Sequence, residues 1–185
     1  MEVLQNYAQH LPADPFDLEE TDRRLETALR GNPSARAALS AAMHDLVGKR
    51  LGVPVYKLWG LDPAKAPMST FTIGIDTPER IRMKVQEAAE YPILKIKLGT
   101  DRDLEILQTI RDATDRELRV DANCGWTVKH AIQMLPVLEE FGVTVLEQPL
   151  VPTDLEGLGV IRMAASIPII ADESCRTASD IPGLV

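Results

Sequence analysis

The fold is decided by residues 93–126, which read ILKIKLGTDRDLEILQTIRDATDRELRVDANCGW. A short apolar run at 93–98 is followed by a helical pattern of apolar residues, and a second short run follows at 118–122. A strand, a helix and another strand within so few residues are typical of a βα unit. In such a unit the two strands run parallel, because the helix crosses back over the sheet.

The same unit recurs on both sides of this stretch. Further strands are predicted at 70–75, 143–147 and 167–171, so the last four strands begin at 93, 118, 143 and 167, in steps of 25, 25 and 24 residues. An open doubly wound sheet and a (β/α)8 barrel both fit this alternation. No glycine-rich G-x-G-x-x-G turn follows the first strand, and the even period favours the barrel. Helix starts are predicted at Thr77-Pro78, Thr100-x-x-Asp103, Thr127, Thr153-x-x-Glu156 and Thr177-x-x-Asp180.

The part before the repeats has a different pattern. Residues 1–32 are polar and predict loops with a short helix around 21–29. Asn32 and Pro33 then suit the N-cap and first position of a helix that ends near 48–52. Residues 54–67 are rich in turn formers, and we expect two parts, 1–66 and 67–185.

Composition restricts the partners. The 185 residues carry 20 Lys and Arg against 28 Asp and Glu, a net charge of −8, which argues against a nucleic-acid or anionic membrane surface. No apolar run has the ~18 residues of a membrane span, and residues 1–11 lack the pattern of a signal peptide. Two cysteines, Cys124 and Cys175, suit a reducing cytosol. We therefore expect a cytoplasmic protein with a small-molecule substrate.

Charged residues mark the ends of the predicted strands. Lys95 and Lys97 lie two apart on one strand, so both side chains point to the same face. Asp121, Glu147 and Asp172 end the next three strands, 24, 26 and 25 residues after the charged residue before each. The carboxyl ends of barrel strands form a ring in which active sites lie, so these groups should converge.

Three convergent carboxylates need a counter-charge. A set of oxygen ligands without His or Cys selects a hard cation, most plausibly Mg2+. A single Asp at a strand end is more often a turn former. Turn formers have no reason to recur in phase with the repeat, however, so the pattern favours a metal-assisted site.

These residues also carry a family resemblance. Lys95-x-Lys97, Asp121-x-Asn123, Glu147-Gln148-Pro149 and Asp172-Glu173-Ser174, in this order and spacing, resemble the enolase superfamily. Within it the chain is similar to the muconate lactonizing enzyme subgroup, and most similar to the dipeptide epimerases of the L-Ala-D/L-Glu type. The resemblance covers residues 32–185 and implies about five of the eight units of a TIM-like barrel, preceded by the helical end of an α+β capping domain.

The resemblance implies a reaction and a role for each residue. Such enzymes remove the proton α to a carboxylate, and Mg2+ (or Mn2+) stabilises the enediolate. By match, the metal ligands are Asp121, Glu147 and Asp172, and Lys97 is the acid/base. Lys95 would favour the neutral form of Lys97 through like-charge proximity. The remaining matched positions are Asn123 and Glu173, which would orient the ligands, and Thr72, which would contact the substrate.

The family pattern also has parts that these residues lack. A second acid/base lysine and a substrate-reading Asp-x-Asp are expected on later strands, and a complete barrel takes ~250 residues. We therefore expect a truncated piece of a longer, homo-oligomeric isomerase that acts on a dipeptide or another carboxylic acid. We expect the piece alone to be inactive. The alternatives are a cycloisomerase or o-succinylbenzoate synthase of the same superfamily, or a non-catalytic remnant.

Overall fold

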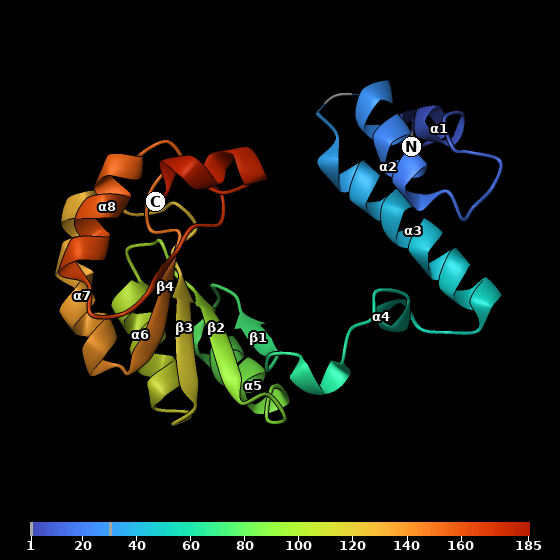
Figure 1. Cartoon of the computed structure of the whole chain (residues 1–185). Helices are drawn as coiled ribbons and strands as arrows, with labels where there is room; N and C mark the ends of the chain where they lie inside the picture. Colours follow the sequence, from blue (N-terminus) through green and yellow to red (C-terminus); the bar gives the residue numbers. More distant parts are fainter. Residues whose placement is uncertain (1, 30) are drawn as a thin grey trace. The chain divides into compact units, whose positions relative to one another are not determined.

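A computed structural model describes residues 2–29 and 31–185 (Figure 1). The chain divides into two compact units, one up to Pro67 and the other from Met68 to Val185. None of the helices in the described ranges combines the length and apolarity that crossing a bilayer requires.

The first unit is helical. Its elements are α1 (Glu2–Ala8), α2 (Leu18–Ala28), α3 (Pro33–Leu51), α4 (Val55–Leu58) and the 3-10 helix η1 (Pro63–Lys65). α2 packs on α3. As predicted, α3 begins at Pro33 after Asn32 in the N-cap position. It ends at Gly52, whose φ of 67° is the left-handed conformation that glycine adopts without strain.

Two features of the first unit differ from the prediction. Helix α1 forms in a segment that was expected to be loop, and α2 begins at Leu18 rather than near residue 21. The reason for α1 is tertiary, because Tyr7 is fully buried and its hydroxyl donates a hydrogen bond of 2.8 Å to the carbonyl of Leu29. A polar local sequence does not reveal such a contact. The prediction for residues 1–32 also covered Met1 and Arg30, which lie outside the described residues.

The second unit is a parallel α/β structure. It runs β1 (Thr70–Ile73), α5 (Pro78–Glu87), β2 (Ile93–Lys97), α6 (Asp103–Arg111), β3 (Glu117–Asp121), α7 (Val128–Glu140), β4 (Val143–Glu147), α8 (Leu155–Ala164), β5 (Ile169–Ile170) and the 3-10 helix η2 (Ala178–Gly183). All strand pairs are parallel, and the sheet order is β1-β2-β3-β4-β5. The α/β fold predicted from the repeat is therefore confirmed. The sheet and its helices form the first five βα units of a barrel.

The helices flank one side of the sheet (Figure 1), as right-handed crossovers between sequential neighbours require. Along β2, Leu94 and Ile96 are buried in the core beneath the helices, whereas Lys95 and Lys97 alternate with them and are partly exposed. The same alternation on β3 and β4 gives the opposite face of the sheet its charged side chains. That face carries the strand-end residues.

The predicted helix starts were partly right. Thr127 caps α7, where its side-chain oxygen accepts the N–H of His130. α6 begins only at Asp103, and α8 is capped by Asp154 rather than Thr153. Asp154 lies one residue nearer the helix, and its carboxylate accepts the N–H of Gly157 at 2.9 Å. A carboxylate in that position is as good a cap as a threonine hydroxyl.

Candidate metal centre

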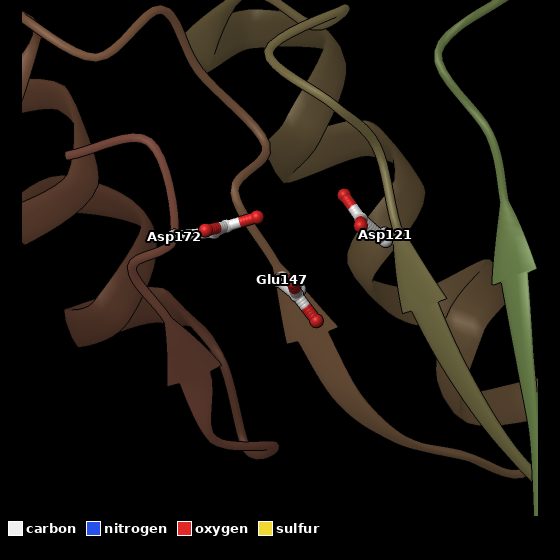
Figure 2. A group of neighbouring side chains, drawn as sticks. All are labelled: Asp121, Glu147 and Asp172. Carbon is white, nitrogen blue, oxygen red and sulfur yellow. The ribbon is translucent and has the colours of Figure 1, made fainter. Parts of the chain in front are cut away.

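Three carboxylates meet at the carboxyl ends of neighbouring strands. Asp121 ends β3 and lies opposite Glu147, the last residue of β4. Glu147 pairs with Ile170 of β5, and Asp172 follows two residues later, on the same face. One carboxylate oxygen from each residue lies within 4.8 Å of the other two (Figure 2). The parallel register, which the 25-residue period anticipated, therefore brings the three predicted residues together.

The three carboxylates differ in exposure. Asp121 is fully buried, Glu147 is half-buried and Asp172 is exposed. The set therefore extends from the end of the buried sheet out to solvent. Such a gradient leaves one side of the group open to a small molecule.

Both lysines of β2 contact the carboxylates. Lys97 lies opposite Asp121 in the register and donates to its Oδ2 at 2.7 Å. Lys95 Nζ lies 2.9 Å from the same oxygen and donates to Glu147 Oε1 at 2.7 Å. Neither lysine forms an ion pair with Asp172 in the described ranges.

These contacts shift two pKa values. Burial of Asp121 disfavours its charged form, but hydrogen bonds from Lys97, Lys95 and the N–H of Asn123 outweigh burial and hold the pKa of Asp121 below its usual value. Burial also opposes the charge on Lys95. Its hydrogen bonds to Glu147 and Asp121 prevail and raise the pKa of Lys95. The Asp121 carboxylate and the Lys95 ammonium thus stabilise each other's charged forms.

The other predicted site residues lie beside this group. The N–H of Asn123 donates to Asp121 Oδ1 at 2.9 Å, and its side-chain amide reaches Glu173 Oε1 at 3.4 Å. Glu173 Oε2 is buried and has no hydrogen-bond partner among the described residues. Thr72 of β1 lies opposite Lys95, so their side chains share the charged face of the sheet. The roles predicted for Asn123, Glu173 and Thr72 remain predictions.

The loops that follow β2 and β3 are in close backbone contact. A Cβ on Gly99 would lie 2.5 Å from the carbonyl oxygen of Ala122, and one on Gly125 would lie 2.6 Å from the Cα of Gly99. Only glycine fits at both positions.

Asp103 joins these two loops, a role that the sequence analysis missed. The residue is 3% exposed. It accepts the N–H groups of Gly99 and Thr100 and, at 2.7 Å, the indole N–H of Trp126. The spacing of Asp103 three residues after Thr100 had suggested a helix cap. That spacing did not indicate the contact of Asp103 with Trp126, 23 residues later.

Cys124 borders the site and is a free thiol, as is Cys175. Burial first, and then the nearby charge of Glu173, raise the pKa of the Cys124 thiol. The thiol form is therefore favoured, so Cys124 is a poor nucleophile and metal ligand.

The donor set suits a hard divalent cation. Carboxylate oxygens are the ligands that Mg2+ prefers, and each of the three residues offers one oxygen to a common region. The two ammonium groups are held at the inner, buried end by Asp121 and Glu147. The exposed end, at Asp172, is free of lysine contacts. The residues present therefore fit the metal that the sequence predicted.

A sheet of successive parallel βα units with carboxylates at its strand ends is the structural class of the enolase-type barrels. Residues 79–185 match the family model described as enolase C-terminal domain-like. Residues 3–60 match the mandelate racemase / muconate lactonizing enzyme N-terminal domain. The chain belongs to the mandelate racemase / muconate lactonizing enzyme family, which confirms the resemblance drawn from its motifs.

Similar proteins are dipeptide epimerases. The chain is 42% identical over 174 residues to an L-Ala-D/L-Glu epimerase of Bacteroides thetaiotaomicron, covering 93% of this chain and 45% of that relative. A crystal structure of a dipeptide epimerase from Cytophaga hutchinsonii, complexed with Mg and the dipeptide D-Ala-L-Val, superimposes with a TM-score of 0.86 at 30% identity. That match covers 99% of this chain and 52% of the other.

A cycloisomerase has nearly the same fold. The crystal structure of muconate cycloisomerase from Pseudomonas fluorescens gives a TM-score of 0.82 at 27% identity, over 97% of this chain and 53% of that one. The chain thus spans about half the length of the relatives that it matches.

Proposed function

We propose that the whole protein is a metal-dependent isomerase that removes the proton α to a carboxylate and epimerises a dipeptide. The observation that carries this proposal is the group of three strand-end carboxylates with two lysines of the adjoining strand held against it. The similarity to named dipeptide epimerases supports the substrate class.

In this proposal Asp121, Glu147 and Asp172 hold Mg2+, and Mn2+ is a second candidate because it accepts the same oxygen ligands. When bound, the cation would stabilise the negative charge that the substrate carboxylate gains during proton removal. Asn123 orients Asp121 through its N–H, and Glu173 is held beside Asn123.

Lys97 is the group that we assign to the α-proton. Its ammonium donates to Asp121 Oδ2, a contact that fixes the side chain on the face of the sheet where the carboxylates end. To accept a proton, Lys97 must first lose its own. Thr72, on the strand next to Lys95, is placed to contact the substrate.

A cycloisomerase of the same family is the second candidate. The observation that favours it is the TM-score of 0.82 to a muconate cycloisomerase. An o-succinylbenzoate synthase and a remnant that keeps the metal ligands without turnover complete the alternatives. For the protein's surroundings we propose the cytoplasm, consistent with two free cysteines, and a homo-oligomeric whole enzyme.

Proton exchange tests the proposal. In the whole protein, Lys97→Ala should stop incorporation of deuterium from D2O at the α-carbon of one L-Ala-D/L-Glu epimer, because Lys97 lies on one side of the substrate. Mass spectrometry or proton NMR of each epimer measures this exchange. Lys84→Ala, which removes an exposed lysine of α5, is the control and should exchange both epimers normally. Normal exchange of both epimers by Lys97→Ala would refute the assignment.

A further inference from the structure

The side chain of Gln148 links two of the strand-end loops. Gln148 follows Glu147 directly and is fully buried, with a φ of 34° that few residues other than glycine adopt. Its Oε1 accepts the N–H of Asp172 at 2.9 Å and the N–H of Ser174 at 3.1 Å. Its Nε2 donates to the carbonyl of Leu150 and to Ser174 Oγ, both at 2.8 Å.

These four bonds use both lone pairs of the amide oxygen and both amide hydrogens. They also fix the orientation of the amide. Two backbone N–H groups face Oε1 and a carbonyl faces Nε2, so a flipped side chain would set donor against donor and acceptor against acceptor. A buried amide satisfied in this way is rigid.

The backbone of Gln148 adds contacts to the strands on both sides. Its N–H donates to the carbonyl of Ile170, the last residue of β5, and its carbonyl accepts the N–H of Cys124 in the loop after β3. Gln148 follows β4 directly and is thus bonded to the segments that follow β3 and β5. The three carboxylates lie at the ends of these three strands.

Asp172 depends on this link more than the other two carboxylates do. Asp121 and Glu147 are the last residues of five-residue strands, whereas Asp172 lies beyond a strand of two residues. Among the residues that the structure describes, the Asp172 N–H is bonded to Gln148 alone. Besides Gln148, the segment is held to the rest of the unit by the bond from Ser174 Oγ to the carbonyl of Pro152 and by a longer bond, 3.4 Å, from the Asn123 side-chain amide to Glu173 Oε1.

We propose that Gln148 is the positioning residue of the carboxylate group. By holding the Asp172 and Ser174 N–H groups with one buried oxygen, it keeps the Asp172 carboxylate within reach of Asp121 and Glu147. It touches neither the metal nor the substrate. This inference rests on the proposed function, because the position of Asp172 matters for the metal that the three carboxylates hold.

Gln148→Met tests the inference, since methionine keeps the length of the side chain and removes both the amide oxygen and its donors. We expect this variant to bind Mg2+ about 10- to 100-fold more weakly than the unchanged chain in a calorimetric titration, the usual loss when a partner of a metal ligand is removed. Ser174→Ala removes one partner of Nε2 and the bond to the Pro152 carbonyl but leaves Oε1 on both N–H groups, so it should keep more of the affinity than Gln148→Met does. Asp154→Ala weakens the cap of α8 and is the control for a general loss of stability.

Amide hydrogen exchange of the metal-free chain gives a second readout, one that a general loss of stability would not produce. The Asp172 and Ser174 amides should be protected in the unchanged chain and in Asp154→Ala, and should lose protection in Gln148→Met while Leu146 stays protected. If Gln148→Met does not fold, the unchanged chain still decides. Protection of these two amides supports the link, and exchange at the rate of exposed amides overturns it.

The Mg2+ titration distinguishes a failure of the positioning role from a failure of the proposed metal-dependent function. An unchanged chain that binds no Mg2+ contradicts the proposed metal centre, and the positioning role falls with it. An unchanged chain that binds Mg2+ and a folded Gln148→Met that binds it equally well contradict the positioning role alone.

Discussion

Asp121 has the greatest electrostatic influence among the three carboxylates. It is fully buried, it accepts from both lysines through one oxygen, and its other oxygen accepts the N–H of Asn123. Removing it would take from Lys97 its ion-pair partner and leave Lys95 with Glu147 alone, as well as removing a candidate ligand. A loss of metal affinity in an Asp121 variant would therefore have more than one cause.

Asp172 allows a cleaner test of the metal centre. It is exposed and pairs with neither lysine, so Asp172→Asn changes one candidate ligand and leaves the ion pairs in place. We expect at least a tenfold loss of Mg2+ affinity, on the order of 1.4 kcal/mol, measured by calorimetry. Glu87→Gln, which changes an exposed carboxylate of α5, should have no effect. Equal affinities of Asp172→Asn and the unchanged chain would rule out a three-carboxylate site.

At this scale the sequence predicted which residues meet but not what holds them. Asp121, Glu147 and Asp172 recur with the period of the βα unit, so their convergence follows from strand geometry. Gln148 and Asp103 act through hydrogen bonds to loops about one unit away. Their partners are backbone N–H groups and an indole, which carry no periodic signal.

Among the elements, the helix N-termini show how far a local pattern is reliable. Thr77 and Thr127 both occupy N-cap positions, as predicted, yet only Thr127 makes a side-chain cap bond. Sequence alone does not separate the two, because the rotamer of the hydroxyl depends on the neighbouring loop. The strand centres were predicted more reliably, since the burial of alternate residues fixes them along the whole sheet.

This difference predicts unequal effects of two matched substitutions. Thr127→Ala should lower the free energy of unfolding by about 1 kcal/mol, because the N–H of His130 loses its partner. Thr77→Ala should have a smaller effect, since no cap bond is lost. Urea unfolding followed by circular dichroism compares the two. If the Thr77 substitution costs as much as the Thr127 one, the assigned cap geometry is wrong.

For the whole molecule, five of the eight barrel units predict a sheet with open edges, and the structure shows which residues lie exposed near one edge, β5. β5 is an edge of the five-stranded sheet, and α8 has a helix neighbour, α7, on one side. A hollow of about 410 Å3 lies here, lined in part by Leu155, Leu158 and Ile169. Periodicity identifies which face of a helix is apolar, but not whether another element covers that face.

The exposed apolar residues of this region predict self-association of the 185-residue chain. Val160 and Met163 of α8 are 49% and 82% exposed, and Ile170 of β5 is 41% exposed beside unpaired backbone groups of the edge strand. Apolar side chains next to an open sheet edge favour pairing with another copy. We expect the apparent mass to rise with protein concentration in size-exclusion chromatography with light scattering.

The double substitution Val160→Lys and Met163→Lys should reduce this association, because it places two charges on the exposed face of α8. Leu104→Lys changes an exposed residue of α6, a helix away from β5 that lies between α5 and α7, and should leave the association unchanged. A chain that stays monomeric at every concentration would show that the sheet edge does not mediate self-association. Equal effects of the α6 and α8 substitutions would mean that association arises from general surface apolarity rather than from the region around β5.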